Sequence, residues 1–132
     1  MLTLENLSLL YEQDKKILED ITLQVAEGEC IILTGESGSG KSSIINSING
    51  LAFEYENARI TGKVHVDGKD IKGMELYQIS LMIASVFQNP KTHFFNVNTT
   101  LELLFYLENI GLDRKEMEIR MENMLKVFPI KH

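Results

Sequence analysis

The first part of the chain carries apolar residues in patterns typical of strands. Residues 2 to 11 alternate roughly between apolar and polar positions, and residues 21 to 25 do so again after a polar turn at 12 to 16. The run "CIILT" at residues 30 to 34 is continuously apolar, which is typical of a strand buried on both faces of a parallel sheet. We therefore predict two strands followed by a buried parallel strand.

The periodicity then changes from that of a strand to that of a helix. A helical pattern begins near Gly40 and ends near Gly50. Between them the isoleucines at positions 44, 45 and 48 fall on one side of the predicted helix. The sequence thus predicts one short helix directly after a glycine-rich segment.

The middle of the chain predicts a hairpin, a helix and a returning strand. Valines at positions 64 and 66 precede Asp67-Gly68, a pair that favours a tight turn between two strands. Residues 74 to 80, "MELYQIS", predict a short helix. Residues 81 to 88, "LMIASVFQ", predict a second buried strand.

Two helices are expected at the end of the chain. The first covers residues 99 to 111, with Thr99 or Thr100 as its cap and Gly111 at its end. The second covers residues 113 to 128, with Asp113 as cap and Pro129 beyond it. One face of the second helix is apolar, through Met117, Met121, Met124, Leu125 and Phe128. Strands alternating with helices after a stranded start indicate an α/β fold with an antiparallel portion.

Composition narrows the class of protein. The chain has 132 residues and a formal net charge of −6, and 44% of its residues are apolar. That length fits one domain or part of a larger one. An acidic chain is a poor general ligand for nucleic acid, because phosphate contacts need clustered Lys and Arg. The single cysteine, Cys30, allows no internal disulfide.

The segment "GESGSGKSS" at residues 35 to 43 carries the clearest chemistry. Gly35, Gly40, Lys41 and Ser42 match the phosphate-binding loop pattern G-x-x-x-x-G-K-[ST], between an apolar run and a helical pattern. Glycines let backbone amides turn inward around anionic oxygens at a helix N-terminus. A flexible glycine-serine turn is the alternative, but the flanking elements favour a nucleotide site.

Each residue of this loop has an expected role in binding nucleotide and metal. Lys41 is expected to reach the β- and γ-phosphates, and the Ser42 hydroxyl to bind a Mg²⁺ that bridges them. The backbone of the loop forms the cradle, through Gly35, Glu36, Ser37, Gly38, Ser39, Gly40, Lys41, Ser42 and Ser43. No N-K-x-D base-reading motif of a GTPase is present in the sequence.

The order of motifs resembles one family. An aromatic residue after the first strand, then "GESGSGKSS", then "VFQNP" after a later strand is similar to the ATP-binding subunits of ABC transporters. The stretch from "SINGLAF" to "NVNTT", and "FQNP" above all, resembles the ATPases of energy-coupling factor transporters, which take up vitamins and transition-metal ions. The resemblance implies a P-loop NTPase fold, with an antiparallel portion, a parallel-sheet core and the start of a helical subdomain. It covers essentially the whole chain but only the first part of the family's domain.

The resemblance implies further site residues. Tyr11 matches the aromatic residue that stacks on adenine, although a strand-end tyrosine packing on the core is the alternative. Gln88 matches the Q-loop glutamine, which would ligate Mg²⁺ or orient the attacking water; otherwise it is a polar residue at a strand end. Phe94 and Phe95 match the region beside the membrane partner, and they also fit a local core.

The resemblance also implies partners and leaves alternatives open. A second ABC ATPase domain would close over the γ-phosphate, and a transmembrane subunit would hold the protein at the cytoplasmic face of the membrane. The family's signature, Walker B and switch motifs are absent, so residues 1 to 132 are expected to be the N-terminal portion of one nucleotide-binding domain. The alternatives are a non-transport ABC ATPase of repair or translation, or a nucleotide-binding fragment without catalysis.

Overall fold

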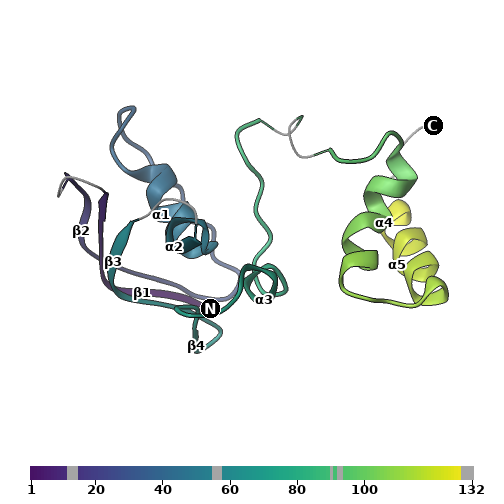
Figure 1. The fold of residues 1–132 in the computed structure, drawn as a ribbon, viewed down its shortest axis with the longest axis horizontal. Helices are drawn as coiled ribbons and strands as arrows, with labels where there is room; N and C mark the ends of the chain where they lie inside the picture. The colour runs from purple at the N-terminus through teal and green to yellow at the C-terminus, as the bar shows by residue number, and fades with distance from the viewer. Residues whose placement is uncertain (12–14, 55–57, 90, 92–93, 129–132) are drawn as a thin grey trace. The chain divides into compact units, whose positions relative to one another are not determined.

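The chain divides into two compact units, residues 1 to 85 and residues 86 to 132. The structure is a computed structural model and describes residues 1 to 11, 15 to 54, 58 to 89, 91 and 94 to 128. The first unit holds a sheet with helices against it, and the second holds a pair of helices (Figure 1). Residues 12 to 14 of the predicted turn at 12 to 16, and Pro129, lie outside the described residues, whereas residues 15 and 16 belong to a strand rather than to the turn.

A four-stranded antiparallel sheet forms the base of the first unit, in the order β2-β1-β3-β4 (Figure 1). Its strands are β1 (Leu2–Tyr11), β2 (Lys15–Val25), β3 (Arg59–Val66) and β4 (Lys69–Asp70). The predicted strand at residues 2 to 11 and the predicted hairpin are confirmed. β2 begins six residues before the predicted start at 21, because its first half also pairs with β1.

The buried leucines of β1 change phase in the middle of the strand. Leu4, Leu7 and Leu9 are fully buried, so their spacing is first three residues and then two. Asn6 lies between them with φ 48°, and the register of β1 against β3 shifts at this point. A β-bulge inserts one extra residue in this way. It explains why the alternation in the sequence is only approximate.

Two helices cover one face of the sheet (Figure 1). They are α1 (Lys41–Ile48) and α2 (Leu51–Glu54), and α3 (Leu76–Ser80) adds one side chain to the same core. This arrangement confirms the predicted helix after Gly40 and the predicted short helix at 74 to 80. The core residues are Leu4, Leu7, Leu9, Leu18, Ala52, Val64, Val66, Ile71 and Ile79.

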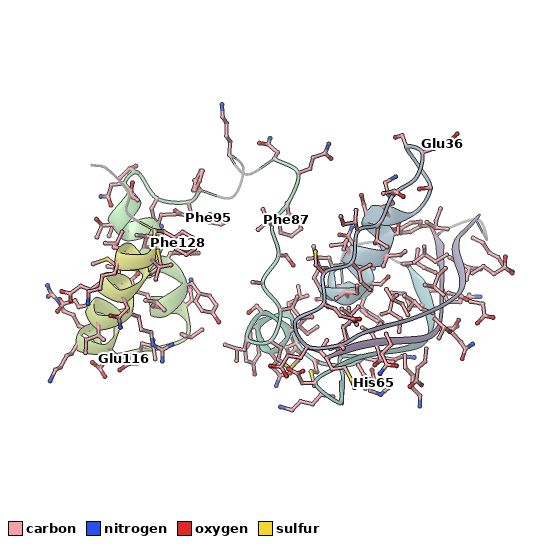
Figure 2. All side chains as sticks on the ribbon, turned by 180° about the vertical axis from the view of Figure 1, so that it is seen from behind. Glu36, His65, Phe87, Phe95, Glu116 and Phe128 are labelled. Atoms are coloured by element: carbon pink, nitrogen blue, oxygen red, sulfur yellow. The ribbon has the colours of Figure 1, made fainter. Side chains whose placement is uncertain are left out.

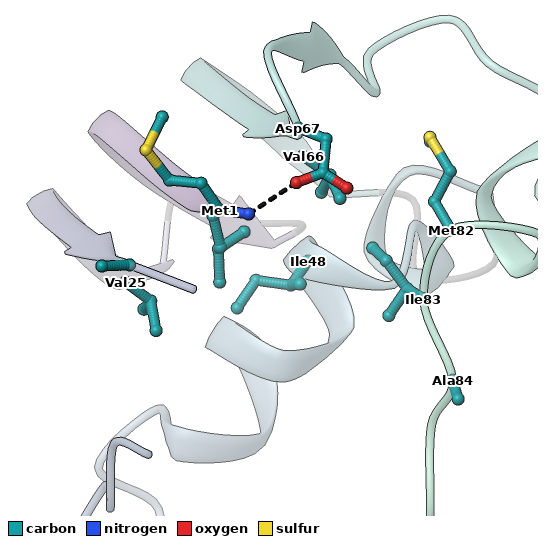
Figure 3. Close-up of a pocket in the computed structure, with 10 residues that line it drawn as sticks. Met1, Val25, Ile48, Val66, Asp67, Met82, Ile83 and Ala84 are labelled. Atoms are coloured by element: carbon teal, nitrogen blue, oxygen red, sulfur yellow. Dashed lines mark hydrogen bonds and ion pairs between the residues drawn. The ribbon is translucent and has the colours of Figure 1, made fainter. Parts of the chain in front are cut away.

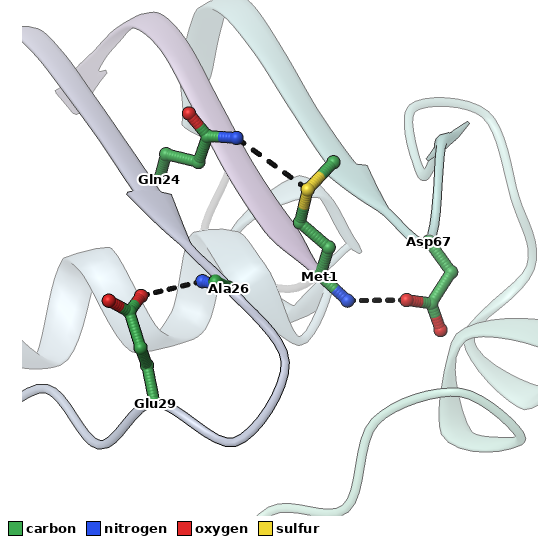
Figure 4. Close-up of polar contacts among 5 residues, drawn as sticks. All are labelled: Met1, Gln24, Ala26, Glu29 and Asp67. Atoms are coloured by element: carbon green, nitrogen blue, oxygen red, sulfur yellow. Dashed lines mark hydrogen bonds and ion pairs between the residues drawn. The ribbon is translucent and has the colours of Figure 1, made fainter.

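The predicted turn joins β3 to β4. Asp67 and Gly68 both have positive φ, 48° and 78°, as a two-residue turn of the primed type requires. The Met1 ammonium donates to the Asp67 carboxylate at 2.5 Å (Figure 4) and lowers the pKa of that exposed carboxyl. Asp67 is thus a turn residue, as expected.

A second turn contact lies just after β2, where the Glu29 carboxylate accepts from the Ala26 amide at 2.6 Å (Figure 4).

The prediction of two buried parallel strands is wrong. Residues 30 to 34 and 81 to 88 form no strand, and their side chains are largely exposed: Ile32 is 80% and Val86 94% exposed. A strand needs a neighbour for its backbone groups, and a parallel strand needs cover on both faces. Among the described residues, no strand pairs with either segment. Their apolar composition therefore predicted burial in a sheet, but neither segment has a neighbouring strand within the described part of the chain.

The second unit consists of α4 (Thr99–Asn109) and α5 (Arg114–Val127). Asn98, rather than Thr99 or Thr100, caps α4, because its side-chain oxygen accepts from the Leu101 amide at 2.8 Å. Asp113 caps α5 as predicted. No helix in the described ranges is long and apolar enough to cross a membrane.

The apolar face predicted for α5 is only partly covered. Its three methionines and Leu125 are half-buried, whereas Phe128 is 65% exposed, so Phe128 does not continue this half-buried face. Phe128 follows the last helical residue, where the backbone leaves the helical conformation. The helical periodicity that placed it on this face therefore no longer applies.

Candidate functional site

The glycine-rich segment forms a loop that leads directly into α1. Gly40 is buried and is the N-cap residue of α1, with φ 89°. A Cβ at this position would lie 2.9 Å from Leu18 Cδ2 and 3.2 Å from the Ile17 carbonyl oxygen. Only glycine combines this backbone angle with so close an approach. The loop is thereby seated on β2, which fixes where α1 begins.

The Lys41 ammonium holds the loop together from inside. Its Nζ donates to the carbonyl oxygens of Gly35 at 3.0 Å and Glu36 at 2.6 Å, and to the Ser39 hydroxyl at 3.2 Å. The Ser39 amide also donates to the Glu36 carbonyl at 3.2 Å. The loop therefore encircles a positive charge that its own oxygen atoms only partly satisfy, because they are neutral acceptors.

The first turn of α1 has the features of an anion site. The N-cap residue is glycine, so no side chain caps the helix, and the first turn contains no acidic residue. The first amides of a helix have no carbonyl partner within it and carry partial positive charge. Ser42 is exposed and Ser43 half-buried in this turn. Amides, hydroxyls and the Lys41 charge are thus brought to one end of α1.

The remaining loop residues lie at the surface. Glu36, Ser37, Gly38 and Ser39 are all exposed, and Glu36 lies at the tip of the loop (Figure 2). A carboxylate repels phosphate, so the expected contribution of Glu36 is its backbone rather than its side chain. The residues from 35 to 43 that the sequence predicts as one site do lie in one continuous loop and helix start.

Tyr11 lies at the end of β1 and is half-buried against the core. Tyr11 pairs with Lys15 at the start of β2. Gly40 contacts the same strand at Leu18, three residues after Lys15. Tyr11 is therefore one strand away from the base of the loop. Partial burial fits a packing role, and partial exposure leaves part of the ring for a ligand.

Gln88, Phe94 and Phe95 belong to the second unit. All three side chains are exposed, Phe94 by 66% and Phe95 by 73%. Phe95 is labelled in Figure 2. The interpretation of the two phenylalanines as local core is therefore wrong, although the Phe95 ring stacks on Phe105. The relation of Gln88 to Lys41 and Ser42 stays a prediction.

Sequence reasoning missed Glu102, whose carboxylate holds the backbone beside Phe95. The signal was an acidic residue in the first turn of a predicted helix, directly after an aromatic segment. That signal alone also fits a simple interaction with the helix N-terminus, which is why the sequence did not single it out.

Two depressions flank α1. One, of about 490 Å³, is lined by Lys41 and Ser42 together with apolar side chains that include Ile31, Leu33 and Ile45. The other, of about 370 Å³, lies where β1 begins and β2 ends, and includes Met1, Asp67 and Met82 (Figure 3). The first adjoins the phosphate loop and consists mostly of side chains from the "CIILT" segment and from α1.

The described part of the chain offers no ready-made metal cluster. It contains no group of three or more His, Cys, Asp or Glu side chains that could hold an ion. Mg²⁺ usually keeps several waters and takes few protein ligands when it binds phosphates. The exposed Ser42 hydroxyl beside Lys41 fits such a site, in which the nucleotide supplies the remaining ligands.

Comparison with known proteins decides the family. A family model described as "ABC transporter" matches residues 18 to 132. The chain belongs to the ABC transporter family. The match confirms the predicted P-loop NTPase fold class. Members of this family bind ATP, generally dimerise and work with transmembrane subunits.

Several relatives support the same assignment for this ABC domain. Three relatives are named by inference as ABC transporter ATP-binding proteins. They come from Methanosarcina mazei, Treponema denticola and Pyrococcus abyssi, and they are 35%, 35% and 37% identical to this chain. The matches cover 96%, 100% and 96% of the chain. They cover 22%, 27% and 46% of the relatives. The chain thus spans less than half of each of these relatives.

Proposed function

We propose that this chain forms the nucleotide-binding part of an ATP-binding subunit of an ABC importer, of the energy-coupling factor type. The observation that carries the proposal is the loop at residues 35 to 40, which encircles the Lys41 ammonium and opens onto the uncapped start of α1. Amides and a positive charge gathered in this way suit a polyphosphate.

Within this site each group has a separate task toward Mg·ATP. The amides of the loop and of the first turn of α1 hold the phosphate oxygens. Lys41 exchanges its neutral carbonyl partners for the charged β- and γ-phosphates, which are the stronger acceptors. Ser42 supplies a hydroxyl ligand to Mg²⁺, which neutralises developing charge on the phosphates when it is bound.

Tyr11 and Gln88 complete the proposal. Tyr11 supplies a ring for the adenine, at the end of the strand that neighbours the base of the loop. Gln88 ligates Mg²⁺ or orients the attacking water through its side-chain amide. Both assignments come from the family resemblance, and the exposed part of each side chain is compatible with them.

The proposed partners are a second ABC ATPase domain and a transmembrane subunit at the cytoplasmic face of the membrane. Family membership supports both kinds of partner. Exposed aromatic side chains at Phe94 and Phe95 support a contact with the transmembrane subunit, because aromatic anchors often dominate interface energy. The "FQNP" stretch is the basis for the energy-coupling factor type. The cargo would be a vitamin or a metal ion.

A nucleotide titration tests the proposal through Lys41→Ala. We expect the variant to bind Mg·ATP about tenfold or more weakly, because a hydrogen bond to a charged group contributes roughly 1.5–3 kcal/mol. Lys72→Ala is the matched control, since Lys72 is an exposed lysine in a turn of the same unit. Circular dichroism checks that both variants are folded. Equal affinity in folded wild type and Lys41→Ala would rule out this phosphate site.

A further inference from the structure

The segment before α4, residues 94 to 97, exposes apolar side chains, and no backbone-to-backbone hydrogen bond within the described ranges holds it in place. Val97 is 97% exposed, and Phe94 and Phe95 are also mostly exposed. Within the described ranges, no backbone-to-backbone hydrogen bond involves residues 94 to 97. A loop with few contacts of this kind opens easily unless something else fixes it. Side chains of α4 supply that support.

One carboxylate oxygen fixes the backbone of this aromatic loop, residues 94 to 97. Glu102 Oε2 accepts from the amides of Phe95 at 3.1 Å and Asn96 at 2.9 Å, and from Asn96 Nδ2 at 3.2 Å. Glu102 is half-buried in the first turn of α4, where the positive end of the helix favours a carboxylate. Three donors therefore converge on a charge that α4 itself holds in place.

A second contact lies on the same face of α4. The rings of Phe95 and Phe105 stack with centroids 5.2 Å apart and an interplanar angle of 21°. Glu102 and Phe105 are three residues apart, so they are neighbours on one face of the helix. Phe94, Val97 and Glu102 also line a depression of about 490 Å³. The carboxylate thus sets the shape of this hollow as well as the backbone of the loop.

We propose that Glu102 is the positioning residue of the aromatic loop: its carboxylate holds the backbone at Phe95 and Asn96 so that Phe94 and Phe95 face outward as a preformed docking surface. The use of that surface rests on the proposed contact with a transmembrane subunit. Preformed surfaces bind more tightly, because less ordering is left to do on association.

Hydrogen–deuterium exchange of the whole chain tests the role of Glu102. Glu102→Ala should speed exchange at the amides of Phe95 and Asn96 by about tenfold or more, as expected for lost charge-assisted bonds. Glu102→Gln keeps an oxygen acceptor at the same reach and should stay within about threefold of wild type. Glu108→Ala is the control, because it removes the same charge from an exposed position on α4.

The amide of Ile110, which donates to the Tyr106 carbonyl at the end of α4, reports on the helix itself. Faster exchange confined to Phe95 and Asn96, with rescue by Gln, supports the positioning role. Unchanged exchange in Glu102→Ala overturns it. If Glu102→Ala melts the helix, exchange is measured in Glu102→Asp instead, which keeps the charge but shortens the side chain. Faster exchange at Phe95 and Asn96 with an intact helix in this variant supports the positioning role. A helix that melts in both variants also overturns the proposal, because Glu102 then stabilises α4 rather than the loop.

A second comparison separates this inference from the proposed function. Phe94→Ser combined with Phe95→Ser should leave Mg·ATP binding intact and weaken transport by the assembled importer. If that double variant transports normally while Glu102→Ala still releases the loop, the docking contact is refuted and the positioning role stands. If the double variant impairs transport but Glu102→Ala leaves the loop protected, the positioning role falls alone.

Discussion

At the scale of single residues, two glycines matter because other parts of the backbone pass close to them. Gly40 seats the phosphate loop on β2, and Gly62 of β3 faces the bulge of β1. A Cβ at Gly62 would lie 2.5 Å from the Glu5 carbonyl oxygen, and φ there is +87°. The motif pattern indicated Gly40 from the sequence. Gly62 was not indicated, because its neighbour is a bulge that lies more than fifty residues away in sequence.

Gly62→Ala should therefore destabilise the first unit strongly. The added carbon clashes with backbone atoms that cannot move aside, and it also forces a positive φ on alanine, so we expect a loss of about 2 kcal/mol or more. Gly28→Ala is the control, since φ there is +78° but a Cβ at that position would meet nothing within 4 Å. That change should cost about 1 kcal/mol. Urea unfolding of the two variants measures the difference, and equal losses would contradict the close approach.

Tyr11 tests the proposed base-stacking role. Tyr11→Leu keeps an apolar side chain against the core but removes the ring, so affinity for ATP and for GTP should fall alike, by about 1–3 kcal/mol. Tyr11→Phe keeps the ring and should retain most of the affinity. Nucleotide titrations of both variants measure this. If Tyr11→Leu binds both nucleotides normally, Tyr11 is a packing residue only.

At the scale of elements, the sequence predicts strands that find their partners within the described residues. β2 follows β1 in the chain, whereas β3 pairs with β1 from a distant part of the sequence, and the buried positions of these strands show a strand pattern. The phosphate loop is predictable because its chemistry is local: glycines, one lysine and a helix start follow one another directly. Residues 30 to 34 and 81 to 88 have equally apolar sequences, yet they form no strand among the described residues. Their composition indicates burial, but a strand also needs a neighbour.

The cap of α4 shows a smaller limit of the same kind. Thr99, Thr100 and Asn98 are all suitable cap residues, so local sequence leaves the boundary open by one or two positions. Asn98 is selected because its extended backbone lets the side-chain oxygen reach the Leu101 amide. Glu102 then lies one position beyond Leu101, where its carboxylate reaches back to the loop. The site on this unit depends on that register.

The cap of α5 gives a test at this scale. The Asp113 carboxylate accepts from the amides of Lys115 at 3.0 Å and Glu116 at 3.1 Å. Asp113→Ala should lower the stability of α5 by about 0.5–2 kcal/mol, whereas Asp113→Ser should lose much less. Glu122→Ala, on an exposed position of the same helix, controls for the change in charge. Helix content followed by circular dichroism during heating measures the effect. Equal melting of the Ala and Ser variants would exclude a capping role.

At the scale of the whole molecule, the apolar surface and the phosphate site lie next to one another. The depression beside Lys41 and Ser42 is lined by Ile31, Leu33 and side chains of α1. Burial of such side chains contributes roughly 25 cal/mol per Å² of apolar area to the free energy of folding. Apolar side chains that stay exposed do not make this contribution. The segment that carries the phosphate loop therefore gains rigidity from whatever covers residues 30 to 34. Nucleotide binding and burial of residues 30 to 34 are expected to support each other, because both hold the same loop.

The last prediction concerns turnover by a polypeptide of residues 1 to 132. We expect it to bind Mg·ATP but not to hydrolyse it at a physiological rate. Phosphoryl transfer needs an oriented water and charge stabilisation on both sides of the γ-phosphate. In the roles proposed above, Lys41, Ser42 and Gln88 would serve one side only, and the sequence contains no identifiable Walker B carboxylates or signature loop for the other. A steady-state phosphate-release assay, with Lys41→Ala as the control for contaminating ATPases, measures this. Turnover that matches an intact transporter ATPase and disappears in Lys41→Ala would show that other residues of this chain carry the chemistry.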